Sequence, residues 1–353
     1  MKIDKNWLII ILVTLVSTIA VWWAVGFKTI YQNFDGPYYL VVAKSWYDKA
    51  TIGKYFSFNL PLEYYPAHFP LYPIATKLIS WLPLLNPLKS MLLINLSATA
   101  ASAIVFFEIL KNKKVPHALF IALVFLFVWP RMWAVRSIGS PETLFILWIL
   151  LSLKYFEFKK YLLAGIFGSL AVLTKSPGIL LFPVYLIASK LDRKIWPTLF
   201  IPISLLILFS FFKIQTGDFL AYFNSGDNIH LQALPFKIFD SSQPWVGSFW
   251  LEDIIWIYLI GGLGVYYAFQ KDRLWGIFGI VFYSVILFVS HRDIARYSLP
   301  LIPIILYGFS DLFKRKEVRI ALILLVIPLY FYTLNFLTHN IVAISDWAPF
   351  LSK

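Results

Sequence analysis

Eleven stretches of this chain are apolar enough to span or enter a lipid bilayer, and the polar segments between them alternate in character. One set is short and rich in Lys and Arg, whereas the other is longer and holds most of the carboxylates. Short basic loops stay on the cytoplasmic side, so this alternation predicts a topology as well as a fold. The segments expected in the cytoplasm are 2–5, 111–114, 159–160, 190–194, 271–273 and 314–319.

The expected fold is an all-α, polytopic membrane protein with about eleven transmembrane helices in one domain over residues 1–353. Several apolar runs are only about 14 residues long between charges, below the roughly 20 residues that a span requires. We therefore expect these runs to extend into their polar flanks or to be broken. The expected spans are 7–27, 88–110, 115–133, 141–157, 161–174, 177–190, 195–212, 252–270, 274–290, 297–313 and 319–338.

The opposite, external side then receives two long segments, 28–87 and 213–250, and three tight turns. Residues 69–85 look like a further span, but a crossing there would reverse the side of every later basic loop. Their prolines, with Lys77 and Trp81, better suit a helix at the external interface. We expect a cytoplasmic N-terminus, an external C-terminus and an external active site on the plasma membrane.

The composition agrees with a membrane protein, since 60% of the residues are hydrophobic, 14% are charged and the mean hydropathy is +0.75. The net charge of +13 predicts no nucleic-acid partner, because basic cytoplasmic loops account for it. The absence of cysteine excludes disulfides and thiolate metal sites. The five histidines have no metal-ligand spacing along the chain, so we expect no His-based metal site.

The sequence FDGPYYLVVAKSWYD follows the first apolar run, and Asp35 stands before its Gly-Pro pair. Aromatic and apolar residues then recur at helical spacing, so 36–50 is expected to form a short amphipathic helix. Two interpretations of Asp35 stay open. Either it caps this helix, or it lies beside a cavity where partial desolvation raises its pKa toward that of a general base.

The first external loop returns to the membrane through NLPLEYYPAHFPLYP, a stretch stiffened by four prolines. His68 is expected either to hydrogen-bond a phosphate or to satisfy a backbone carbonyl, and the pattern does not decide between them. Glu63 fits a solvated surface position better than a position in a substrate cavity, although both interpretations remain open.

Arg131 and Arg136 precede an apolar run that begins with SPE. Ser140 and Glu142 fit a helix start, because such residues satisfy free backbone N–H groups in the first turn. A functional role for Glu142 is the alternative. Both arginines fall on the expected external side, against the usual bias of basic residues, which favours an anionic partner there.

Lys175 in TKSPG and the group Arg292, Asp293 and Arg296 in HRDIARY complete the external charges. An ion pair between Asp293 and one arginine accounts for a single positive charge, so at least one arginine is left over. Guanidinium groups match phosphate oxygens, and an uncompensated charge at membrane depth is costly. These cations therefore favour a phosphate at the headgroup level.

Six motifs occur in order along the chain: FDGPYYLVVA, HFPLYP, SPETLF, LAGIFGSLAVLTKSPGILLFP, TGDFLAYF and ARYSLPLIP. Their order and placement resemble the GT-C superfamily of polyprenyl-phosphate-sugar-dependent glycosyltransferases, and most closely the PIG-V-like GPI mannosyltransferases. The resemblance covers residues from about 30 to 312. It implies a multi-span fold with juxtamembrane helices at 36–50 and 69–85. Phe34 departs from the family, which often has Trp before Asp-Gly.

The resemblance also implies a reaction in which an acceptor hydroxyl attacks the anomeric carbon of a sugar, a hexose such as mannose, carried on a polyprenyl phosphate. The configuration inverts, Asp35 is the general base, and the phosphate leaves without an acid catalyst. The acceptor is a glycan, a lipid or a protein, and no cofactor or divalent metal is expected. We expect phosphate-binding residues Arg292, Arg296, Lys175, Arg136, Arg131 and His68, and cavity residues Tyr38, Tyr39, Glu63 and Glu142.

Two other functions stay open. A lipid or saccharide transporter or flippase would favour internal repeats and ionisable residues at mid-membrane. Glu108 is the clearest carboxylate within an expected span, and it lies near the cytoplasmic end of that span. A non-catalytic homologue is the second alternative, and Asp35 beside several external cations argues against it.

Overall fold

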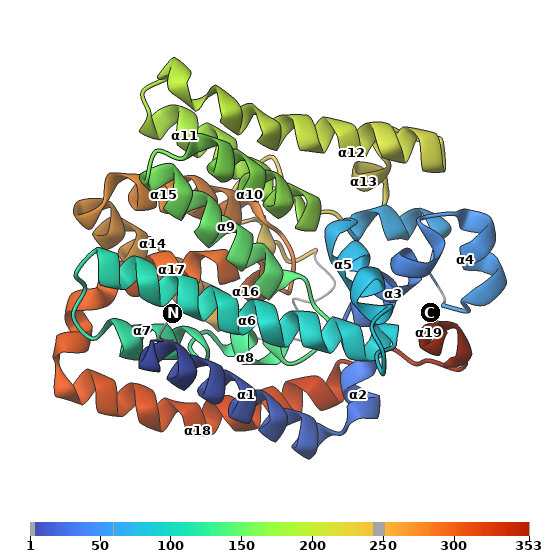
Figure 1. Cartoon of the computed structure of the whole chain (residues 1–353), viewed down its shortest axis with the longest axis horizontal. Helices are drawn as coiled ribbons and strands as arrows, with labels where there is room; N and C mark the ends of the chain where they lie inside the picture. The colour runs from blue at the N-terminus through green and yellow to red at the C-terminus, as the bar shows by residue number, and fades with distance from the viewer. Residues whose placement is uncertain (1–3, 59, 243–250, 353) are drawn as a thin grey trace.

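The computed structural model describes residues 4–58, 60–242 and 251–352, and helices dominate this part of the chain (Figure 1). The α-helices are α1 (Lys5–Val25), α2 (Phe27–Tyr31), α3 (Gly36–Ser45), α4 (Lys49–Tyr55), α5 (Leu71–Ser80), α6 (Pro87–Asn112), α7 (Ala118–Phe125), α8 (Pro130–Arg136), α9 (Glu142–Glu157), α10 (Tyr161–Thr174), α11 (Leu181–Ala188), α12 (Phe200–Thr216), α13 (Ala221–Asn224), α14 (Glu252–Lys271), α15 (Arg273–Phe288), α16 (Ile294–Tyr297), α17 (Ile302–Gly308), α18 (Lys316–His339) and α19 (Ala348–Leu351). The 3₁₀ helices are η1 (Leu62–Ala67), η2 (Ser176–Leu180), η3 (Arg193–Leu199), η4 (Lys237–Phe239), η5 (Leu299–Leu301) and η6 (Phe309–Lys314).

Helices occupy each of the eleven apolar runs, and the all-α membrane fold is confirmed. Four helical segments in the described ranges are long and apolar enough to cross a membrane: α1, α6, α18 and the continuous 193–216 helix formed by η3 and α12. The other runs are shorter or broken. The 115–133 run, for example, ends its helix at Phe125 and turns at Trp129, whose φ is +82°, before α8 begins at Pro130. The number of eleven spans therefore stays a prediction.

The short basic segments meet at one end of the molecule, which we call the basic end. Asp4 near the N-terminus pairs with Lys111 at 3.1 Å between Oδ2 and Nζ. Lys113 contacts both Glu157 and Asp272, with Nζ to carboxylate distances of 2.5 and 2.6 Å. These pairs join segments that are far apart along the chain. This is the grouping that the loop charges predict.

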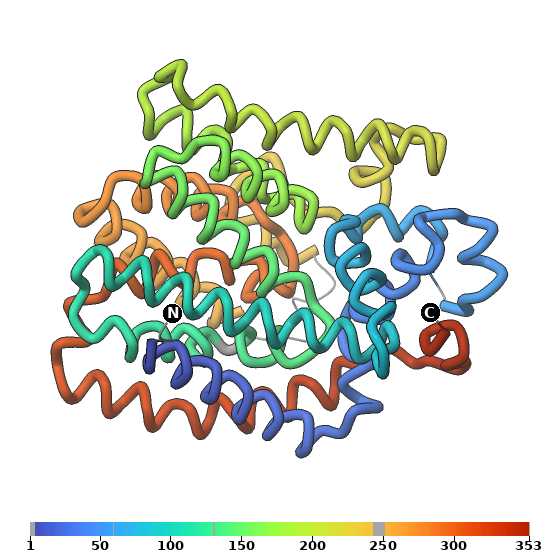
Figure 2. Tube along the Cα trace, viewed as in Figure 1, coloured from blue at the N-terminus to red at the C-terminus, as the bar shows by residue number. Residues whose placement is uncertain are grey.

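The segment 28–87 forms the other end, the loop end, and the C-terminal residues pack against it (Figure 2). Lys44 donates from Nζ to the Ser352 hydroxyl at 2.7 Å, and the ring of Phe350 packs against those of Phe56 and Phe58. The helix expected at 36–50 ends at Ser45, because the backbone turns at Trp46 with a φ of +51°, and a separate helix α4 follows; the helix expected at 69–85 is present as the shorter α5. The C-terminus therefore lies on the same end as the first long loop, as the sequence predicts.

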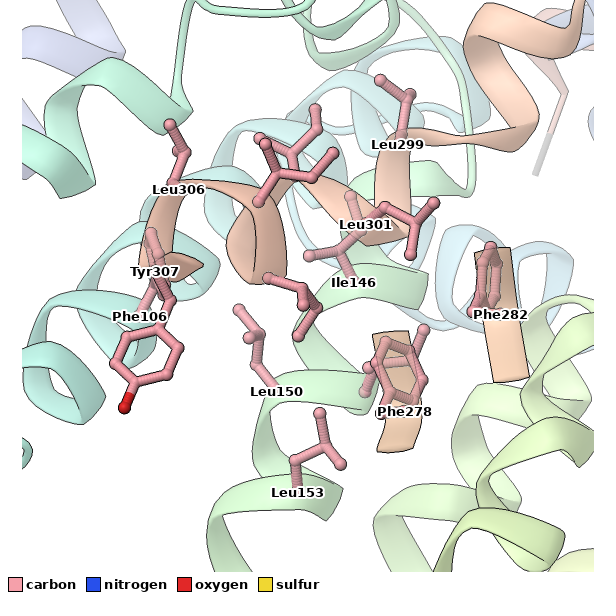
Figure 3. Close-up of a cluster of buried hydrophobic side chains, with 14 of the residues drawn as sticks. Phe106, Ile146, Leu150, Leu153, Phe278, Phe282, Leu299, Leu301, Leu306 and Tyr307 are labelled. Atoms are coloured by element: carbon pink, nitrogen blue, oxygen red, sulfur yellow. The ribbon is translucent and has the colours of Figure 1, made fainter. Parts of the chain in front are cut away.

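The core between the two ends is a set of tightly packed apolar side chains from α6, α9, α15 and α17 (Figure 3). Phe106, Ile146, Leu150 and Phe278 are all buried there. Lipid tails are as apolar as these side chains, so close packing rather than transfer out of water holds such helices together. This rigid core fixes the ends of α9 and α17, and their neighbouring turns build the site described next.

Candidate active site

A cavity of about 880 Å³ opens at the loop end, where α3, α8, α16 and the last turns of α18 meet. A small adjoining pocket of about 40 Å³ extends from it toward His68 and the TKSPG turn. Asp35, Asp227 and Arg296 line both spaces. Residues from five separate parts of the sequence that the sequence analysis singles out therefore converge on one region.

Asp35 stands at the N-cap of α3, but its side chain makes no capping hydrogen bond. Its Oδ2 instead accepts a hydrogen bond from Nη1 of Arg296 at 2.5 Å. Capping is therefore the wrong interpretation, and the cavity carboxylate is the right one. Burial raises the pKa of Asp35 and Arg296 opposes that rise, so the pKa settles at about 6.

A close backbone contact fixes the position of Asp35. A Cβ atom added to Gly36 would lie 3.1 Å from the carbonyl oxygen of Gly139, in the loop that precedes α9. The start of α3 and this loop can approach so closely because Gly36 has no side chain. The approach carries Asp35 toward Glu142 at the start of α9.

Arg296 is the hub of the charged groups. Its Nε lies 3.0 Å from a carboxylate oxygen of Asp293 and 3.6 Å from one of Glu142, in addition to the contact with Asp35. Its guanidinium carbon lies 4.0 Å from the centroid of the Phe34 ring. The Phe that departs from the family pattern thus stacks on the central arginine, an arrangement favourable for a cation and an aromatic face.

Glu142 is a charge partner in this network rather than a helix cap. The N-cap of α9 is Pro141, which makes no side-chain hydrogen bond. Glu142 is only 2% exposed, and its carboxylate accepts hydrogen bonds from the Ser140 hydroxyl and from Nζ of Lys175, the latter at 2.7 Å. The capping interpretation of Ser140 and Glu142 is therefore wrong. The sequence could not reveal the true partner of Glu142, because Lys175 lies 33 residues further along the chain.

Two further arginines line the large cavity. Arg131 pairs with Asp293 at 3.1 Å, and its guanidinium lies 3.7 Å from the Phe336 ring centroid on α18. Arg292 is exposed to the cavity and forms no ion pair with any residue that the structure describes. Arg292 is therefore the arginine that the sequence analysis leaves over, and it remains available to an anion.

Arg136 lies elsewhere, against the expectation that it binds phosphate. It is fully buried and donates to three neutral acceptors, the carbonyl of Leu126 and the hydroxyls of Ser17 and Thr18, at 2.7 to 2.9 Å. These bonds tie α1 to α8. Arg136 does not line the cavity, and its external placement reflects packing rather than an anion.

Glu63 also lies outside the cavity. Its side chain is 60% exposed and pairs with Lys49 at 2.7 Å on the surface of the loop. The expectation that it lines a substrate cavity is therefore corrected, and the solvated interpretation is right. Because Glu63 makes no contact with Arg296 or its carboxylate partners, it is a suitable control for experiments on Asp35.

Tyr38, Tyr39 and His68 form an aromatic wall beside Asp35. The His68 ring packs edge-on against those of Tyr38 and Tyr39, with centroids 5.7 and 4.7 Å apart. Burial lowers the pKa of His68 to about 4, so the ring is neutral near pH 7 and cannot act as a cation toward phosphate. Its buried Nδ1 makes no hydrogen bond within the described residues, which leaves it able to meet a polar ligand group.

Asp227 is a site residue that the sequence analysis missed. It lies between α13 and η4 in the second long loop and lines both cavities. Burial alone would raise its pKa, but His230, His68 and Tyr64 outweigh that effect and lower it to about 2. The available signal was the polar turn SGDNIH within an otherwise aromatic loop.

An apolar cavity of about 570 Å³ lies beside the charged one, between α7, α14, α17 and α18. Tyr332 on α18 borders both cavities. Most of the side chains that line the apolar cavity are aliphatic or aromatic, among them Trp256, Ile305 and Leu325. The charged site and a space suited to a hydrocarbon chain are therefore neighbours.

No protein-family model matches the sequence, and no characterised protein matches it by sequence. Two solved structures share the fold. ArnT from Cupriavidus metallidurans, bound to undecaprenyl phosphate, superimposes with a TM-score of 0.58 at 13% identity, over 96% of this chain and 78% of ArnT. The archaeal oligosaccharyltransferase AglB from Archaeoglobus fulgidus, in complex with an inhibitory peptide and a dolichol-phosphate, gives 0.54 at 13% identity, over 96% of this chain.

The chain spans 57% of the AglB chain, so AglB extends well beyond the shared part. Both neighbours have the GT-C fold, and the GT-C fold expected from the six motifs is thereby confirmed. With its long apolar helices, the chain is an integral membrane protein. The PIG-V-like subfamily stays a prediction.

Proposed function

We propose that this protein is a membrane glycosyltransferase that moves a sugar from a polyprenyl-phosphate donor to an acceptor hydroxyl. The observation that carries the proposal is the partly buried Asp35, paired with Arg296 at the wall of a large cavity. A carboxylate with a pKa of about 6 suits a general base near neutral pH. The likeness to ArnT and AglB, whose structures hold undecaprenyl phosphate and dolichol-phosphate, supports the lipid-phosphate donor.

The two neighbouring cavities suit the two parts of such a donor. The apolar cavity takes the first isoprene units, and the phosphate then lies near Tyr332, where the spaces meet. Arg131, Arg292 and Arg296 are the arginines that line the large cavity, and guanidinium groups pair with phosphate oxygens through parallel hydrogen bonds. The sugar then projects toward Asp35.

The reaction is a single displacement at the anomeric carbon. The acceptor oxygen forms a bond to that carbon while its proton passes to Asp35, and the bond from the carbon to the phosphate oxygen breaks. The electron pair of the broken bond stays on the lipid phosphate, whose growing negative charge the arginines stabilise. Attack opposite the leaving group inverts the configuration, and no acid catalyst is required.

Donor binding also prepares the base. In the structure Arg296 is bound to Asp35, and a phosphate that takes over part of this guanidinium releases the carboxylate for the acceptor. Loss of that contact raises the proton affinity of Asp35, because the arginine favours the charged carboxylate. The base therefore becomes stronger when the donor is in place.

The finer assignments belong to the same proposal. The donor sugar is a hexose such as mannose, the acceptor is a glycan, lipid or protein, and the second long loop with Asp227 contacts the acceptor. The site faces the outside of the plasma membrane. The charge alternation and the PIG-V-like resemblance support these assignments.

Asp35→Asn tests the proposal, because it keeps the shape of the side chain but removes the proton acceptor. Turnover of a labelled sugar from a synthetic polyprenyl-phosphate donor in liposomes should fall by about 10² to 10⁴, the usual range for a general base. Glu63→Gln, on the surface of the same loop, is the matched control and should keep full activity. Full turnover by Asp35→Asn would remove Asp35 from the mechanism, and lipid translocation without sugar transfer by the wild type would indicate a flippase.

A further inference from the structure

Three side chains beside the large cavity form a cluster that has no part in the displacement step proposed above. Asp227, His230 and His291 each offer one ligand atom, and these atoms all lie within 4.8 Å of one another. The two imidazole rings lie nearly parallel, with centroids 4.6 Å apart. The spacing of the histidines along the chain conceals this arrangement, because the fold brings together two distant segments.

The backbone holds the two histidines side by side. Leu231, next to His230, forms an antiparallel bridge with Val289, two residues before His291, and the N–H of Ser290 donates to the carbonyl of His230 at 3.1 Å. His230 itself has a φ of +54°, a conformation that costs energy for a residue with a side chain. Strained backbone of this kind concentrates at functional sites.

His230 also carries an unmet hydrogen-bonding group. Its Nε2 is buried and makes no hydrogen bond within the described part of the chain, although Oδ1 of Asp227 lies 3.5 Å away. Buried polar atoms are nearly always bonded, and an exception calls for a missing partner such as an ion. A metal between these two atoms would satisfy both.

We propose that Asp227, His230 and His291 bind a divalent transition-metal ion of the Zn²⁺ type. Two imidazoles and one carboxylate form a known three-residue ligand set that leaves one coordination position open. Asp227 and His291 both line the large cavity, so the open position faces it. Tetrahedral Zn²⁺ holds its ligand atoms about 3.4 Å apart, so side-chain movements of about 1 Å close the site.

The charges around the cavity accommodate such an ion. Four carboxylates, Asp35, Glu142, Asp227 and Asp293, face four cations, Arg131, Lys175, Arg292 and Arg296. When the phosphodiester of the proposed donor pairs with Arg292, the whole set is left with one net negative charge. A divalent cation supplies the missing positive charge. This step rests on the proposed function, whereas the ligand geometry does not.

Metal binding is measured on the full chain without a polyhistidine tag, purified in detergent and treated with a chelator. Zn²⁺ titrated by calorimetry, and Co²⁺ followed by its visible absorption, should each saturate at one ion per chain. Because two ligands alone hold such ions poorly, His230→Ala and His291→Ala should each weaken binding at least 100-fold. Asp227→Asn should weaken it about 10- to 100-fold, and His339→Ala, an exposed histidine lining the same cavity, is the matched control and should bind as the wild type does.

Folding is monitored separately by the melting temperature in chelator, which should be similar for wild type and variants, while added Zn²⁺ should raise that of the wild type and of His339→Ala. Absence of saturable Zn²⁺ binding in the wild type would overturn the proposal. So would binding that survives loss of both His230 and His291. Neither measurement uses a sugar donor, so a failed metal site and a failed transferase assignment are told apart.

Discussion

Burial and the guanidinium of Arg296 shift the pKa of Asp35 in opposite directions. Burial favours the protonated acid, whereas the guanidinium favours the carboxylate, and the pKa of about 6 is the result. A base with this pKa is largely ionised at neutral pH and still binds a proton usefully. The same contact keeps Asp35 from the acceptor until an anion competes for Arg296.

This pKa predicts the acid limb of the pH profile. Below about pH 6 Asp35 is protonated and cannot accept the hydroxyl proton, so kcat/KM should fall about tenfold for each further pH unit. Above that pH the carboxylate is ionised and the profile should level off. Measurement of kcat/KM between pH 4.5 and 8 with saturating acceptor checks this. A flat profile down to pH 4.5 would contradict Asp35 as the base.

Arg292 and Arg136 should respond in opposite ways to loss of charge. Arg292→Gln should weaken donor binding by about 10- to 100-fold with an unchanged melting temperature, because hydrogen bonds to charged groups contribute about 1.5–3 kcal/mol. Arg136→Met removes buried bonds between helices, so it should lower the melting temperature and leave the donor affinity of the folded protein intact. Binding of a fluorescent polyprenyl phosphate measures the first effect. Equal donor affinity in Arg292→Gln and wild type would remove Arg292 from the phosphate site.

The sequence identifies the charged residues better than it identifies their partners. The Gly-Pro turn and the resemblance single out Asp35, and the bias against external cations singles out Arg296. The same bias wrongly places Arg136 among the phosphate-binding residues. The carbonyl and hydroxyl groups that accept hydrogen bonds from its guanidinium cannot be recognised in the sequence around it. Glu142 resembles a helix cap for the same reason, since its partner Lys175 comes from another turn.

At the scale of elements, the site depends on how closely α3 approaches the loop before α9. Gly36 faces the carbonyl of Gly139, so this contact sets the position of Asp35 relative to Glu142. The sequence predicts α3 and α9 but not the contact, because helical periodicity says nothing about which turns meet. Boundaries of the short helices are hard to predict for a related reason: prolines such as Pro300 and Pro303 break one apolar run into several turns.

Gly36→Ala tests this approach. The added Cβ would lie 3.1 Å from the Gly139 oxygen, so α3 must shift by a few tenths of an ångström, and turnover should fall several-fold with a loss of stability of about 1–3 kcal/mol. Gly53→Ala on α4 is the matched control, since nothing lies within 4 Å of its added Cβ. Alanine favours a helix, so Gly53→Ala should keep activity and stability. Equal turnover by the two variants would show that the close contact does not position Asp35.

At the scale of the whole molecule, the two ends follow from the loop charges. The alternation groups 2–5, 111–114 and 271–273, and the ion pairs of Lys111 and Lys113 join these segments. The pairing of Asp35 with Arg296 cannot be predicted from the loop charges, because it depends on the path of every helix between the two residues. The same holds for His230 and His291, whose distance along the chain hides their contact.

The assignment of each end to a side of the membrane gives the last prediction. Single cysteines at Lys54 and Asp346, both at the loop end, should react with an impermeant thiol reagent on intact cells, whereas one at Lys160 should react only after permeabilisation. The chain has no other cysteine to interfere. Ser57 and Ser345 lie 3.0 Å apart between their hydroxyl oxygens, so the double variant Ser57→Cys with Ser345→Cys should also cross-link on mild oxidation. Labelling at position 160 on intact cells, with positions 54 and 346 protected, would show that the true topology is the reverse of the predicted one. The cross-link does not depend on the side of the membrane, so it would still test the fold.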